Sequence, residues 1–61
     1  MLWMFVGGEK NQLVCLETGA LITSRDGRAH LEGPGDSTVG DLAIRFDELV
    51  QELKRRQVLV S

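Results

Sequence analysis

The feature that most constrains the fold is an apolar stripe in the second half of the chain. Its members recur at steps of three and four residues: Val39, Leu42, Ala43, Phe46, Leu49, Val50 and Leu53. Such steps line one face of an α-helix. Thr38 and Asp41 stand where a capping box would open the helix, and Ser37 or Asp36 could cap it instead. Lys54, Arg55 and Arg56 suit the negative end of its dipole. The pattern predicts an amphipathic helix over 38–56.

Ile44 is the one apolar residue of this stretch that lies off the stripe. On a helix it would project among Asp41, Glu48 and Gln51, on the polar side. A single exposed isoleucine is ordinary on a protein surface. We therefore interpret Ile44 as a surface residue of the predicted helix.

Turn residues divide the first half of the chain into four short apolar segments. The segments are predicted strands over 2–6, 12–17, 20–25 and 28–32, separated by a glycine-bearing loop over 7–11 and by the pairs Thr18-Gly19 and Asp26-Gly27. The predicted fold class is α+β: a small antiparallel four-stranded β-meander followed by one amphipathic C-terminal helix packed on one sheet face. Residues 1–61 form a single domain in this interpretation. Its apolar tail over 58–60 is either an extra edge strand or an arm onto a neighbour.

Two-residue turns would fix the strand register. Cys15 would then lie opposite Ile22, Ile22 opposite Leu31, and Ser24 opposite Ala29. One face of the sheet, predicted as the seat of the helix, would carry Leu13, Cys15, Ile22, Ala29 and Leu31. The opposite face would keep an apolar cluster that one helix cannot cover.

The length of the chain makes a partner subunit the expected source of extra stability. A fold of about 60 residues buries only about 60% of its unfolded surface, and its core contributes about 3–5 kcal/mol. Cys15 is the only cysteine and His30 the only histidine, so neither an internal disulfide nor a closed zinc site is expected. We predict a homodimer. The residues expected nearest its interface are Trp3, Phe5, Val14, Leu16, Leu21, Val58, Leu59 and Val60.

Candidate chemistry in the sequence is sparse. The segment 33–40 could hold an anion at a helix N-terminus, but it lacks the lysine of a P-loop and carries Asp36. His30 has no second histidine or nucleophile beside it in the sequence, and the apolar neighbours of Cys15 favour an inert buried thiol. The sequence predicts no catalytic, cofactor-binding or metal-binding residue, and no enzyme.

Charge patterning supports a non-catalytic interaction or regulatory module acting through protein–protein contacts. The net charge of −2 is unlike the basicity of dedicated nucleic-acid binders. The alternative is a small nucleic-acid-binding regulator that uses Arg25, Arg28, Lys54, Arg55 and Arg56. The apolar opening run over 1–6 lacks a basic leader and is too short to span a bilayer. Together with the lone cysteine, it leads us to expect a cytoplasmic protein without a membrane segment.

Overall fold

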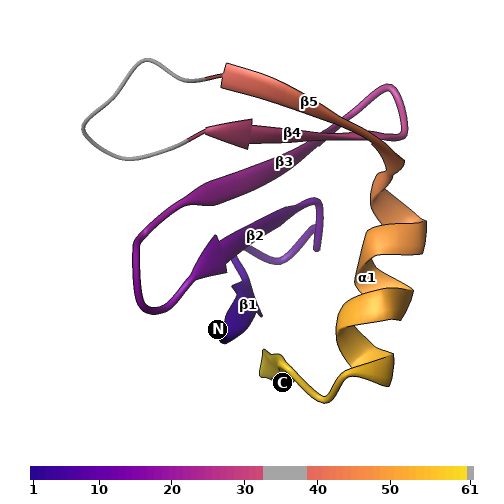
Figure 1. Cartoon of the computed structure of the whole chain (residues 1–61). Helices are drawn as coiled ribbons and strands as arrows, with labels where there is room; N and C mark the ends of the chain where they lie inside the picture. The colour runs from indigo at the N-terminus through magenta and orange to yellow at the C-terminus, as the bar shows by residue number, and fades with distance from the viewer. Residues whose placement is uncertain (33–38, 61) are drawn as a thin grey trace.

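The structure is a small α+β fold in which one helix lies against a curled mixed sheet of six strands (Figure 1). It is a computed structural model and describes residues 1–32 and 39–60. The elements are β1 (Trp3–Phe5), β2 (Gln12–Cys15), β3 (Leu21–Arg25), β4 (Arg28–Glu32), β5 (Val39–Arg45), α1 (Phe46–Arg55) and β6 (Leu59–Val60). The sheet order is β5-β4-β3-β2-β1-β6.

The predicted four-stranded sheet is wrong as a whole: β1 to β4 pair antiparallel in chain order, but two further strands extend the sheet, and one of them is parallel to its neighbour. β5 pairs antiparallel with β4 at one edge, whereas β6 pairs parallel with β1 at the other. The helix therefore connects the two edges of the sheet and crosses one of its faces, the inner face (Figure 1). The other face, the outer face, is not covered by α1.

The predicted helix over 38–56 is wrong in its first third. Residues Val39–Arg45 form the strand β5, and the helix begins only at Phe46. Periodicity alone cannot separate a short strand from a helical turn in a run of this length, and the open edge of β4 offers backbone partners that the sequence pattern does not reveal. Asp41, predicted to cap the helix, pairs in register with His30 instead. Thr38 and most of the segment 33–40 lie outside the described residues.

The start of α1 is fixed by the neighbouring hairpin. Arg45 is the N-cap residue, in extended conformation and without a side-chain cap. The Phe46 N–H donates a 2.9 Å hydrogen bond to the carbonyl of Gly27 in the β3–β4 turn. The Asp47 carboxylate accepts the Glu48 N–H at 2.9 Å. One of the first free donors of the helix is thus satisfied by the turn.

The β3–β4 hairpin has the predicted register. Ile22 lies opposite Leu31 and Ser24 opposite Ala29. Asp26 and Gly27 both have positive φ, at 53° and 79°, as a type I′ turn requires.

The β2–β3 hairpin corrects the predicted register by two residues. Leu13, and not Cys15, lies opposite Ile22. The turn contains four residues, because the Cys15 N–H donates to the Ala20 carbonyl and the Gly19 N–H to the Cys15 carbonyl, both at 2.8 Å. A shift by two residues leaves every side chain on its predicted face.

The core lies between the inner face and the helix. Its buried cluster consists of Leu13, Ile22, Ala29, Phe46, Val50 and Leu53. Cys15 is buried beside β1, as predicted, and its thiol lies 3.4 Å from a Glu17 carboxylate oxygen. Ile44 is half-buried against this core, which corrects its assignment to the surface.

The tail over 58–60 turns back onto the sheet. The Gln57 N–H donates to the Lys54 carbonyl and the Val58 N–H to the Leu53 carbonyl, the two bonds of a Schellman C-cap. The Trp3 N–H then donates to the Val58 carbonyl at 2.9 Å. Of the two alternatives for the tail, the structure shows the edge strand.

Candidate interaction surface

The outer face carries an apolar row that runs across four neighbouring strands. Val60 lies beside Met4, Met4 opposite Val14, and Val14 opposite Leu21. Leu16 lies next to this row on the same side, and its N–H donates to the Leu2 carbonyl at 2.9 Å. We call this surface the outer patch. It consists of Leu2, Met4, Val6, Val14, Leu16, Leu21 and Val60.

The outer patch contains most of the strongly exposed apolar side chains of the described residues. Val14, Leu21 and Val60 are half-buried, and the other four members have exposed fractions from 37% at Val6 to 48% at Leu16. They result from strand geometry, because successive side chains of β1 and of β2 point to opposite faces. An apolar cluster of this kind is typical of an interaction surface.

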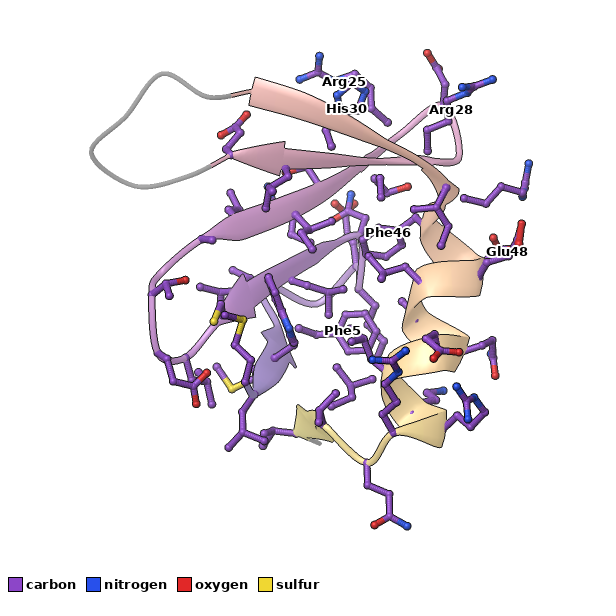
Figure 2. The ribbon with its side chains drawn as sticks, in the orientation of Figure 1. Phe5, Arg25, Arg28, His30, Phe46 and Glu48 are labelled. Atoms are coloured by element: carbon purple, nitrogen blue, oxygen red, sulfur yellow. The ribbon has the colours of Figure 1, made fainter. Side chains whose placement is uncertain are left out.

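The structure divides the predicted interface residues between the two faces of the sheet. Trp3, Phe5, Val58 and Leu59 pack against the core on the helix side. Figure 2 shows Phe5 pointing into the space between sheet and helix, where Phe46 also lies. Val14, Leu16, Leu21 and Val60 belong to the outer patch.

Three members of the outer patch were not among the predicted interface residues. Leu2, Met4 and Val6 alternate with Trp3 and Phe5 along the first strand. Alternation alone would have placed them together on one face. It does not say which of two apolar faces the helix covers, and that depends on the path of α1 across the sheet.

The basic residues of the nucleic-acid alternative fall into two separate groups. Arg25 lies opposite Arg28, and Arg28 opposite Arg45, at the hairpin end of the sheet (Figure 2). A shallow groove of about 360 Å³ beside Arg28 is also lined by the carboxylates of Asp26 and Glu48. Carboxylates therefore lie beside Arg28 in this groove, and Arg45 pairs with Asp47 at 3.3 Å.

The second basic group lies at the other end of the helix. Glu52 accepts hydrogen bonds from both Arg55 and Arg56. These contacts lower the pKa of the Glu52 carboxyl and raise the pKa of the Arg55 guanidinium. Because α1 separates the two groups, one chain does not present them as a single stripe (Figure 1).

Glu17 ties the β2–β3 turn to the beginning of the chain. Its carboxylate accepts the Leu2 N–H at 2.7 Å, and this hydrogen bond is the main cause of its lowered pKa. A carboxyl group whose pKa is lowered by folding contributes stability above its unfolded pKa, near 4.5. That contribution is lost as the pH falls through the lower folded value.

The residues considered for chemistry occupy separate places in the fold. His30 is half-buried on β4, between Thr23 and Asp41 in register, and Cys15 lies in the core on the inner face. Among the described residues, no three His, Cys, Asp or Glu side chains come together as a metal site.

Comparison of the chain with protein-family models, with curated proteins and with solved structures found no match. In the part of the chain that the structure describes, no helix has both the length and the apolar character needed to cross a membrane.

Proposed function

We propose that the protein is a non-catalytic interaction module that forms a homodimer through the outer patch. The observation that carries this proposal is the apolar row Val60–Met4–Val14–Leu21, which continues across four strands on the face without a helix. Two sheets can pack face to face at about 10 Å, with their inner side chains interdigitated. Two outer patches would complete such a sandwich.

A second copy of the chain is a suitable partner for this surface because an apolar, uncharged patch can pack against an identical one. In a two-fold interface, the same patch meets itself. The seven members of the outer patch carry no charge, so pairing two patches brings no like charges from these side chains together. The stability that association adds is important for a chain of 61 residues, since a core of this size supplies only about 3–5 kcal/mol.

The nucleic-acid alternative has less support from the arrangement of charges. It requires the hairpin arginines and the helix-terminal cations to act together. Arg28 lies beside Asp26 and Glu48 in the groove at the hairpin end, and Glu52 engages Arg55 and Arg56. We therefore favour protein–protein association.

The test is the oligomeric state of the full chain and of one charged variant. Sedimentation equilibrium at tens of micromolar should show a dimer. Leu16→Glu should raise the dimer Kd by about two orders of magnitude or more, because the closed interface buries the new carboxylate twice. Circular dichroism checks that the variant stays folded.

Gln51→Glu is the matched control. It adds the same negative charge at an exposed position of α1, away from the outer patch. This variant should dimerise like the unmodified protein. A well-folded monomer at these concentrations, or equal dimerisation of Leu16→Glu, would overturn the proposal.

A further inference from the structure

A groove lies at the β6 edge of the sheet, beside the end of the helix. It has a volume of about 810 Å³, within the range of about 300–1,000 Å³ that is usual for small-molecule sites. Its lining residues are Met4, Phe5, Lys10, Lys54, Gln57, Leu59 and Val60. Four of them are apolar and come from the paired strands β1 and β6.

The polar lining residues come from the loop between β1 and β2, from the last turn of α1 and from the turn that follows the helix. Lys10 belongs to the loop between β1 and β2 and has a φ of 57°. Gln57 has a φ of 61° and sits in the Schellman C-cap of α1, three residues after Lys54. Non-glycine residues in this left-handed region are uncommon and often lie at functional positions. Here these segments place polar side chains around an apolar floor.

The charge in this groove has one sign. Lys10 and Lys54 are the only two lysines of the chain, and both line it. The described lining residues include no aspartate or glutamate, although the net charge of the chain is −2. The nearest carboxylate along the helix, that of Glu52, is engaged by Arg55 and Arg56.

We propose that this groove binds a single-chain anionic amphiphile, represented by an alkyl carboxylate. The alkyl chain would lie on Phe5 and Leu59, the two apolar lining residues on the helix side of the sheet, which removes apolar surface from water on both partners. The head group would lie between the ammonium groups of Lys10 and Lys54, which present charged donors to a carboxylate. This binding activity goes beyond dimerisation, although Met4 and Val60 line the groove and also belong to the outer patch.

Decanoate, kept below its micelle concentration, is the probe, and amide chemical shifts of the isotope-labelled full chain are the readout. We expect one saturable site, with the largest shifts at Lys10, Lys54 and Gln57. Replacing both lysines, Lys10→Gln with Lys54→Gln, should raise the Kd about three- to thirtyfold, since each exposed ion pair contributes modestly. Decyltrimethylammonium, with the same chain length and the opposite charge, should bind more weakly than decanoate.

Two matched variants separate this site from the other surfaces. Arg28→Gln removes one positive charge at the hairpin end and should leave the decanoate Kd unchanged. Leu16→Glu alters the outer patch without touching a lining residue of the groove, so decanoate should still bind the dissociated variant at one saturable site. The two proposals can therefore fail independently.

Three results would overturn the amphiphile site. The first is absence of saturable binding at millimolar decanoate. The second is a set of shifts centred on Leu16 and Leu21, which would place the ligand on the outer patch. The third is equal affinity of the double lysine variant, or of the cationic amphiphile.

Discussion

The two faces of the sheet are built from the same strands but differ in how far their side chains are exposed. On β2, Leu13 is 0% exposed on the inner face, whereas Leu16, next to the end of the strand, is 48% exposed on the outer face. Both are leucines, and they lie three positions apart. The difference between them arises from the path of α1, which crosses one face only.

This comparison separates what holds the chain together from what it offers to a partner. The inner face and the helix share one buried cluster, so its residues act on the folding of a single chain. Among the residues that the structure describes, no helix covers the outer patch. Its residues should act on association, and their effects should depend on protein concentration.

The largest expected effect is that of Phe46→Ala on the inner side. Phe46 is buried at the start of α1 and belongs to the core cluster. Loss of a buried phenylalanine ring costs about 3–5 kcal/mol, comparable with the whole stability expected of a core this small. Urea or thermal unfolding should show a largely unfolded variant at every protein concentration.

Leu16→Ala is the outer-face counterpart. At low protein concentration its free energy of unfolding should stay within about 0.5 kcal/mol of the unmodified chain, as for most surface changes. A difference should emerge only as the concentration rises. If Phe46→Ala kept near-native stability, or if Leu16→Ala destabilised the dilute chain equally, the contrast between the faces would be wrong.

Local sequence signals predicted the meander and failed at β5. The pair Asp26-Gly27 predicted a two-residue turn, and both residues do have positive φ. The register of the β3–β4 hairpin follows from this turn. Thr18-Gly19 predicts a two-residue turn, but a four-residue turn can also end in a glycine of positive φ, and this one does, with a φ of 79° at Gly19. Val39–Arg45 became a strand through pairing with β4, a contact between segments that periodicity does not encode.

Ile44 was the sequence signal that could have revealed the error. It did not fit the helical stripe, and the structure places it half-buried against the core just before the helix starts. The candidate surface was predictable to a similar degree. Alternation separated Val14 and Leu16 from the core, whereas the edge position of Val60 required the turn after α1.

The β3–β4 turn offers a smaller effect that tests the register behind this comparison. Gly27 has a φ of 79°, and its carbonyl accepts the Phe46 N–H. Gly27→Val should cost about 1–3 kcal/mol, because a β-branched residue is strained in this region. A new Cβ would meet the Arg45 guanidinium only at an ordinary 3.6 Å, so backbone strain is the expected cause.

Gly8→Val is the control for that change. Gly8 lies outside the positive-φ positions, and a new Cβ there would have no neighbour within 4 Å. Thermal unfolding of both variants should show a loss of folding stability for Gly27→Val alone. Equal stabilities would contradict the type I′ turn and the face assignments that depend on it.

The smallest expected effect lies where the chain passes from the helix to the β6 edge. Gln57 follows the C-cap residue Arg56, at the C′ position where glycine is usual, and has a φ of 61°. Gln57→Gly should stabilise the fold by about 0.5–1 kcal/mol. The left-handed conformation costs a residue with a side chain about 1–2 kcal/mol, and the larger conformational entropy that glycine loses on folding offsets part of this gain. Gln51→Gly, the same substitution inside α1, should instead destabilise it by about 1 kcal/mol. Urea unfolding of the two variants measures both changes in the free energy of unfolding, and we expect them to have opposite signs. Destabilisation by both substitutions would mean that the side chain of Gln57 stabilises the fold by more than its left-handed backbone destabilises it.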